Sequence, residues 1–184
     1  MDLFRHALLS LLVVGTAASA QQQTCQTIML STCQVDLFMG SLDHIQNNFP
    51  EVSAARDGGT GTVALYCPLI NNAGVESFSS DDADHWGHWT LIARDPDDAA
   101  LQHDVSAQLL AFSRTDNGQD NISDLSSSLS PGTAIGNMTE YAVDIDEYTF
   151  DFRAWDYLVV VNVIRQSTPE FAAGRSIQFC PGKI

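Results

Sequence analysis

The stretch DYLVVVNVIR, residues 156–165, decides the fold class of this chain. Apart from Asn162, its interior is an unbroken run of apolar and mostly β-branched residues, which favour extended strands. A strand that is apolar on both faces is typical of the centre of a sheet that is covered on both sides. Either the same chain or a second copy covers the second face, so the sequence leaves the oligomeric state open.

Alternation of apolar and polar residues continues on either side of this central segment. Six further segments show it with differing clarity, at residues 62–70, 88–94, 105–112, 140–146, 148–154 and 175–180. Side chains alternate between the two faces of a strand, so the apolar set of each segment faces one core. The clearest inward sets are Val63, Leu65 and Cys67, then Trp89, Leu91 and Ala93, then Tyr141, Val143 and Ile145, and last Tyr148, Phe150, Phe152 and Ala154. Strands separated by turns, without helical crossovers, predict a mainly β fold: an antiparallel β-sandwich or jelly-roll-like single domain.

Two short helical turns are expected beside the strands. The first covers residues 41–49, where Ser41 is a potential cap and apolar residues follow at helical spacing. The second covers residues 95–103, where Asp95 is a potential N-cap and Pro96 takes the first helical position. The polar segment 115–138 is predicted to be a long loop or a pair of turns.

The N-terminus has the three-part layout of a secretory signal peptide. Arg5 precedes an apolar run that is much shorter than the ~20 residues of a membrane span, and an A-x-A cleavage site ends at Ala20. Removal of residues 1–20 leaves residues 21–184 as one disulfide-bonded domain. The protein is therefore predicted to be secreted and extracellular, or periplasmic in a bacterium, and no membrane span is expected.

All four cysteines follow the predicted cleavage site: Cys25, Cys33, Cys67 and Cys180. An even number of cysteines in an exported chain predicts two disulfides. The sequence does not choose among the three connectivities. A bridge from Cys180 to a distant cysteine would close a long loop and stabilise the fold most in the chain-entropy model.

The charge balance excludes some partners. Asp and Glu number 23 against 8 Lys and Arg, and the formal net charge is −15 at pH 7. Such a surface repels phosphate backbones and anionic lipids, so nucleic acid and membrane surfaces are not expected partners. An excess of aspartate is explained by many turns and caps, and a calcium-binding surface is the alternative.

The stretch DDADHWGHW, residues 81–89, holds the candidate site residues. His85 and His88 are candidate ligand-binding residues, and a transition metal would need the chain to turn at Gly87 to bring both imidazoles together. An irregular calcium site would use Asp81, Asp82 and Asp84. No cofactor is certain, and Ca²⁺ is the one considered. The simplest interpretation is an acidic turn that leads into a strand.

Trp86 is the candidate for an exposed aromatic platform. Trp89 alternates with Leu91 and is assigned to the core, whereas Trp86 has the opposite parity unless Gly87 shifts the register. An exposed indole would bind a sugar ring or another apolar surface.

Catalytic motifs are absent from the sequence: there is no G-x-S-x-G and no H-E-x-x-H. Asp144 and Asp146 would share one face of a strand about 6.5–7 Å apart, which suits paired glycosidase carboxylates but is more typical of a solvated face. The chain is interpreted as a non-catalytic binding or surface-structural module with an unknown extracellular ligand, a glycan or a protein. The alternative is an extracellular, metal-assisted hydrolase that uses His85, His88 and nearby aspartates.

Two N-glycosylation sequons begin at Asn121 and Asn137. They would carry glycan only in a eukaryotic secretory pathway.

Overall fold

The computed structural model of the chain describes residues 25–35, 45–48, 51–54, 61–71, 75–82, 84–96, 103–129, 132–135, 137–165 and 172–184. The predicted signal peptide lies outside this part of the chain. No helix among the described residues has the length and apolar character needed to cross a membrane.

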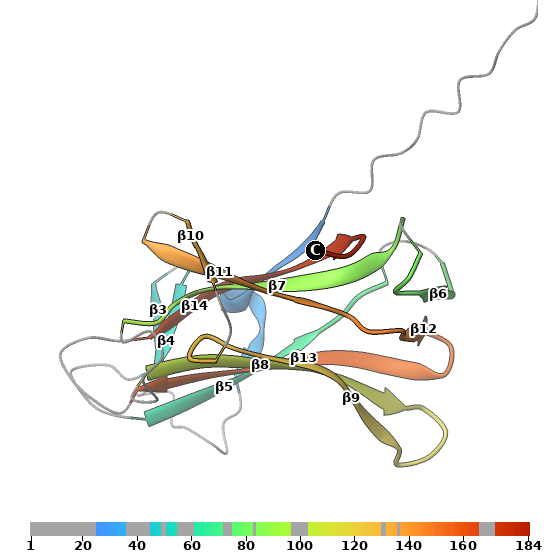
Figure 1. The fold of residues 1–184 in the computed structure, drawn as a ribbon. Coiled ribbons are helices and arrows are strands. Elements are labelled where there is room, and N and C mark those ends of the chain that lie inside the picture. The colour runs from blue at the N-terminus through green and yellow to red at the C-terminus, as the bar shows by residue number, and fades with distance from the viewer. Residues whose placement is uncertain are drawn as a thin grey trace, which may run out of the picture.

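Two antiparallel sheets lie face to face and form a β-sandwich, as predicted (Figure 1). The larger sheet has seven strands in the order β10-β11-β7-β14-β4-β3, and β1 also pairs with β14. Its strands are β1 (Gln26–Met29), β3 (Ile45–Asn48), β4 (Glu51–Ala54), β7 (Trp86–Arg94), β10 (Gly132–Ile135), β11 (Met138–Asp144) and β14 (Ala173–Pro181).

The opposite sheet has five strands in the order β2-β5-β13-β8-β9. They are β2 (Gln34–Val35), β5 (Gly61–Pro68), β8 (His103–Ser113), β9 (Gln119–Ser126) and β13 (Trp155–Arg165). A two-stranded ribbon of β6 (Ser77–Ser79) and β12 (Thr149–Asp151) lies at one end of the sandwich (Figure 1).

Strand β13 has the central place that its sequence predicts, between β5 and β8. Only one of its faces is fully buried. Tyr157, Val159, Val161 and Val163 are buried in the core, whereas Leu158, Val160, Asn162 and Ile164 on the other face are half-buried.

The core lies between the two sheets and is built from the predicted inward positions. Trp89 and Leu91 of β7 and Phe179 of β14 are fully buried on one side, and Leu65 of β5 and Leu109 of β8 are buried on the other. The period-two pattern predicts these faces correctly because a strand with one buried face keeps its apolar residues on that face.

The helical turn predicted over residues 41–49 is wrong where the structure describes it, because Ile45–Asn48 forms strand β3 and pairs with β4. The two strands are antiparallel, and Asn48 pairs with Glu51. The interior of the other predicted turn, residues 97–102, lies outside the described residues. The carboxylate of Asp95 accepts hydrogen bonds from the hydroxyls of Ser127 and Ser128 at 2.7 and 3.2 Å.

The polar segment 115–138 contains two strands rather than only loops, so that prediction is also wrong. Strand β9 pairs with β8, and β10 pairs with β11 at the edge of the larger sheet. An edge strand does not need an apolar face, and polar residues at a sheet edge oppose pairing with other chains.

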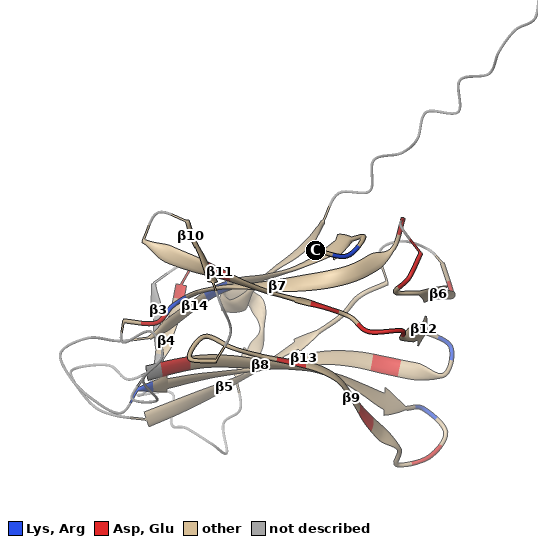
Figure 2. Ribbon diagram, in the orientation of Figure 1, with Lys and Arg blue, Asp and Glu red and all other residues tan. Residues whose placement is uncertain are grey.

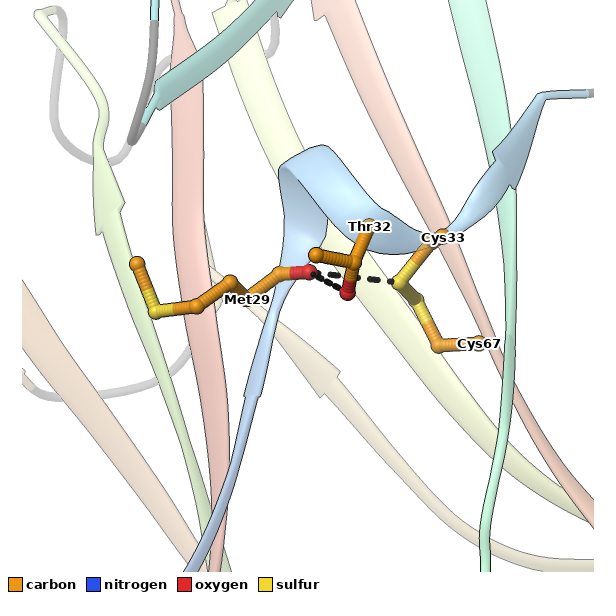
Figure 3. The surroundings of a disulfide bond; sticks show 4 residues. All are labelled: Met29, Thr32, Cys33 and Cys67. Carbon is orange, nitrogen blue, oxygen red and sulfur yellow. Dashed lines mark hydrogen bonds between the residues drawn. A yellow bond between two sulfur atoms is a disulfide. The ribbon is translucent and has the colours of Figure 1, made fainter.

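The four cysteines form the two predicted disulfides, Cys25–Cys180 and Cys33–Cys67. The one short helix described, the 3₁₀ turn η1 (Leu30–Thr32), ends beside Cys33 and directs that side chain toward Cys67 of β5 (Figure 3). The hydroxyl of Thr32 closes the turn by donating to the carbonyl of Met29 at 2.7 Å. These bridges join segments that are 155 and 34 residues apart in sequence.

Candidate functional site

The stretch DDADHWGHW connects β6 to β7, and a bulge at Gly87 decides where its side chains lie. Cys180 pairs with His88, but Pro181 pairs with Trp86, so β7 has one more residue than β14 at this point. An extra residue in one strand reverses the parity of the residues before it. Trp86 therefore faces the core together with Trp89.

The expectation that Trp86 is an exposed platform is wrong. Its side chain is 9% exposed. It packs edge-on against Phe78, Phe150 and Phe152, with ring centroids 5.4, 5.6 and 6.0 Å away, and lies 5.0 Å from Phe179. Edge-to-face ring pairs stabilise a core beyond the area they bury.

Both histidines of the stretch contact the protein itself. Nδ1 of His88 lies 2.8 Å from the carbonyl oxygen of Gly182, and the ring of His85 stacks on Phe78 with centroids 4.7 Å apart. The backbone N–H of Gly182 donates to the carbonyl of His85 at 3.3 Å. The residues after β14 therefore lie against this turn, where Gly182 contacts the backbone of His85 and the ring of His88.

Glycine is required on both sides of this contact. A Cβ on Gly87 would lie 2.2 Å from the carbonyl oxygen of Gly182, and Gly182 itself has a φ of +72°. Both positions therefore disfavour any residue with a side chain.

Two of the aspartates of the turn, Asp81 and Asp82, have partners in the protein. Lys183 contacts Asp81 at 2.7 Å, and this hydrogen bond raises the pKa of the lysine. Asp82 accepts the backbone N–H of Ser79 at 3.3 Å, and Asp84 is exposed. Figure 2 shows acidic residues gathered at this end of the sandwich, in the segments between β6 and β7 and between β11 and β12, with a basic residue beside the C-terminus.

Metal binding finds no support in this geometry. Within the described residues, no three His, Cys, Asp or Glu side chains come close enough together to hold a metal ion. The calcium and transition-metal hypotheses for residues 81–88 stay untested, and so does the metal-assisted hydrolase.

Asp144 and Asp146, the carboxylates considered from the sequence as a catalytic pair, both act electrostatically on Lys183. Strand β11 ends at Asp144, so Asp146 lies beyond it. Asp144 accepts the backbone N–H of Ile184 at 2.8 Å, which is another contact of the last residues with this end of the sandwich.

The two sequons lie on the surface. Asn121 is exposed on β9, and Asn137 is exposed in the turn between β10 and β11. Exposure permits glycosylation of either side chain and does not show it.

A different surface has the composition of a binding site: the side of the five-stranded sheet that points away from the core. One residue from each strand forms a continuous line across it, which we call the outer row. The outer row is Gln34 (β2), Tyr66 (β5), Val160 (β13), Gln108 (β8) and Asp124 (β9), paired directly in register. Four strand spacings of about 4.8 Å make it about 19 Å long.

The outer row is apolar in the middle and polar at both ends. Tyr66 and Val160 are half-buried, and Gln34, Gln108 and Asp124 are exposed. Half-buried Leu158 and buried Leu110 extend the apolar part along β13 and β8.

Three of the polar side chains at the β8–β9 end hold one another in place, and we call them the polar triad: Gln108, Asn121 and Asp124. The amide of Gln108 donates to one carboxylate oxygen of Asp124 at 3.0 Å. The amide of Asn121 donates to the other carboxylate oxygen at 2.8 Å.

Sequence reasoning missed these residues for an identifiable reason. Tyr66 stands between two inward residues, Leu65 and Cys67, so its outward direction was predictable. The direction of the Asp124 side chain was not predictable, because the sequence does not identify β9 as a strand. Only the sheet register brings Gln34 and Asp124 into one row.

Comparison with known proteins adds little. No family model matches the chain, and no curated protein matches it. A solved structure that matches is that of Caldicellulosiruptor saccharolyticus CBM27-1 in complex with mannohexaose, 9% identical, with a TM-score of 0.33. The match covers 85% of this chain and 86% of that one. A likeness at this level says nothing about the ligand of this chain.

Proposed function

We propose that this protein is an exported, non-catalytic binding module whose ligand lies on the outer row. The observation that carries the proposal is the row itself. It crosses all five strands of one sheet, it combines an aromatic and an aliphatic side chain with flanking amides and a carboxylate, and it points away from the core. Binding sites are typically apolar with a few fixed polar groups.

The contacts of the other candidate surface favour this assignment. In the DDADHWGHW turn, His88 binds the carbonyl of Gly182, Asp81 binds Lys183, and Trp86 is buried. These side chains have structural partners, so the turn offers few groups to a ligand.

Export is supported by the cysteines and by the N-terminal sequence. All four cysteines are paired, which fits an oxidising compartment outside the cytosol. We place the protein outside the cell, or in the periplasm of a bacterium, and we assign it a glycan or a protein as ligand.

The test is a positive charge placed in the middle of the outer row and, in a second variant, at its β9 end. Val160→Arg puts a long cation among half-buried apolar side chains, and Asp124→Arg reverses the charge at the exposed β9 end of the row. Gln178→Arg is the matched control, because Gln178 is half-buried on the outward side of the opposite sheet. Each variant is applied to glycan and cell-surface protein arrays after thermal unfolding has confirmed that it folds.

We expect both outer-row variants to lose the signals of the wild-type protein and Gln178→Arg to keep them. Equal signals from all four proteins, or loss confined to Gln178→Arg, would place the binding site elsewhere and contradict the proposal.

A further inference from the structure

We infer that the ligand of the outer row is an uncharged glycan, with a sugar ring over the apolar centre and its hydroxyl groups on the polar triad. The inference rests on the proposed function and adds the chemical class of the ligand.

The polar triad fixes which groups face a ligand. A carboxylate can only accept hydrogen bonds, so the amide nitrogens of Gln108 and Asn121 must point toward Asp124. Their amide oxygens then point elsewhere, and among the described residues they have no hydrogen-bond donor. Each amide nitrogen also keeps a second N–H. The triad therefore presents fixed donors and acceptors side by side on β8 and β9, which are adjacent strands (Figure 1).

Hydroxyl groups match this arrangement because each is both a donor and an acceptor. Adjacent hydroxyls on a sugar ring would pair with an amide oxygen and an amide N–H at once. Asp124 holds the amides in place before binding, which lowers the conformational entropy that binding costs.

The centre of the outer row suits the other surface of a sugar. A pyranose ring carries C–H groups on its faces and hydroxyls on its rim. Tyr66 and Val160 are neighbours in register, and Leu158 lies two residues before Val160 on the same face of β13. An amphipathic ligand thus meets apolar side chains in the middle and polar ones at the β8–β9 end.

The charge of the protein narrows the chemical class of the ligand further. The net charge of −15 disfavours an anionic glycan. On the same face, Asp156 is bound by Nε of Arg114 at 3.0 Å, and Asp124 is an exposed carboxylate that already accepts one hydrogen from each amide of the polar triad. The hydrogen-bonding groups of Gln34, Gln108 and Asn121 are neutral amides, which favours an uncharged ligand, and a polylysine probe tests whether the charge of Asp124 attracts a basic peptide instead.

The experiment titrates the full-length mature protein with defined oligosaccharides. Secretion into the periplasm of a bacterial host lets both disulfides form and leaves Asn121 without glycan. The uncharged probes are cello-, manno-, xylo- and chito-hexaose, the anionic probe is an oligogalacturonate, and a polylysine peptide is the cationic probe. Isothermal calorimetry gives the affinity, and amide chemical-shift changes locate the site.

Gln108→Ala is the main variant, since Gln108 is exposed and its loss leaves the core intact. Gln178→Ala on the opposite sheet is its control. We expect one or more uncharged hexaoses to bind with shifts on β5, β8, β9 and β13. Gln108→Ala should weaken that binding about tenfold or more, because it removes one hydrogen bond to the ligand and leaves Asp124 and Asn121 less well fixed. Gln178→Ala should leave the affinity unchanged.

The other outcomes separate the two proposals. Binding of only oligogalacturonate or polylysine at the outer row overturns the glycan class and keeps the proposed function. Hexaose binding that maps to the opposite sheet, or that Gln178→Ala weakens and Gln108→Ala does not, overturns the assignment of the site and with it the proposed function. No binding of any uncharged hexaose at millimolar concentration overturns the inference alone.

Discussion

Nε1 of Trp89 donates a 2.7 Å hydrogen bond to the hydroxyl of Ser123, and this bond joins the two sheets of the sandwich from β7 to β9. Trp89 is fully buried, so its indole N–H depends on this partner. Ser123 is also the third residue of the sequon that begins at Asn121.

Ser123→Ala should therefore destabilise the protein even where no glycan is attached. Leaving the indole N–H buried without an acceptor costs about 1–3 kcal/mol in the free energy of unfolding. Urea unfolding of protein from a bacterial host measures this loss. Asn121→Gln removes the same sequon but keeps the Ser123 hydroxyl, and we expect it to change stability by less than about 0.5 kcal/mol. Equal stabilities of the two variants would show that the bond contributes nothing.

Trp86→Ala should act through folding and not through ligand binding. Removing a buried indole costs about 3–5 kcal/mol in the free energy of unfolding, because four aromatic rings lose their partner. Ile70→Ala is the control, since Ile70 is 65% exposed. Chemical denaturation compares the two. A Trp86 variant of wild-type stability that has lost a ligand would restore the exposed-platform interpretation.

Gly87→Ala should separate the residues after β14 from the turn. Its Cβ would overlap the carbonyl oxygen of Gly182, and backbone atoms must shift to relieve this, at about 1–3 kcal/mol. Gly61→Ala is a matched substitution with open space around the added methyl group, and we expect it to be neutral or slightly stabilising. Thermal unfolding of both variants gives the comparison, and amide exchange at Gly182 reports local opening. Similar melting temperatures for the two variants would contradict the close contact.

The stability of the fold should fall in alkali partly because of Tyr148. Burial, followed by the neighbouring Tyr157, raises the pKa of Tyr148 above its ordinary value. A pKa that is raised in the folded state stabilises the protein fully below the unfolded value of about 10, and this contribution is lost as the pH rises toward the folded value. Unfolding free energies measured from pH 8 to 11 should fall more steeply for wild type than for Tyr148→Phe. Parallel curves would show that Tyr148 titrates normally.

Added calcium should leave the melting temperature unchanged. Asp81 is bound by Lys183, Asp82 accepts a backbone N–H, and no three suitable ligands converge within the described residues. Thermal unfolding in millimolar calcium and in a chelator tests this. A melting temperature that rises with calcium concentration, and that stops doing so in Asp84→Asn, would establish the calcium site considered from the sequence.

The sequence correctly predicts which residues of the main strands face the core of the sandwich, but it does not predict the bulge at Gly87 or strand β9. Val63, Leu65 and Cys67 stand at every second position because one face of β5 is buried, so the alternation in the sequence predicts that face. Trp86 breaks the pattern because one extra residue at Gly87 reverses its parity, and sequence periodicity cannot locate a bulge. Strand β9 escaped prediction because it is a polar edge strand, stabilised by pairing with β8 and not by an apolar stripe.

The candidate site was beyond sequence reasoning for a related reason. Outward positions have no required periodicity, so Gln108 and Asp124 look like ordinary surface residues. The register of the sheet identifies them as a group, because it places Asp124 opposite Gln108 and aligns both residues with Val160 and Tyr66. The histidines and tryptophans of DDADHWGHW were conspicuous by residue type, yet their contacts are structural.

The bridge between Cys25 and Cys180 also decides how the protein would respond to mechanical force. Their Cα atoms lie 4.3 Å apart although 155 residues separate them in sequence. Tension applied through segments that flank the two cysteines would pass along one covalent bridge and bypass every strand between them. The sandwich would stay folded under loads that unzip unbridged β domains.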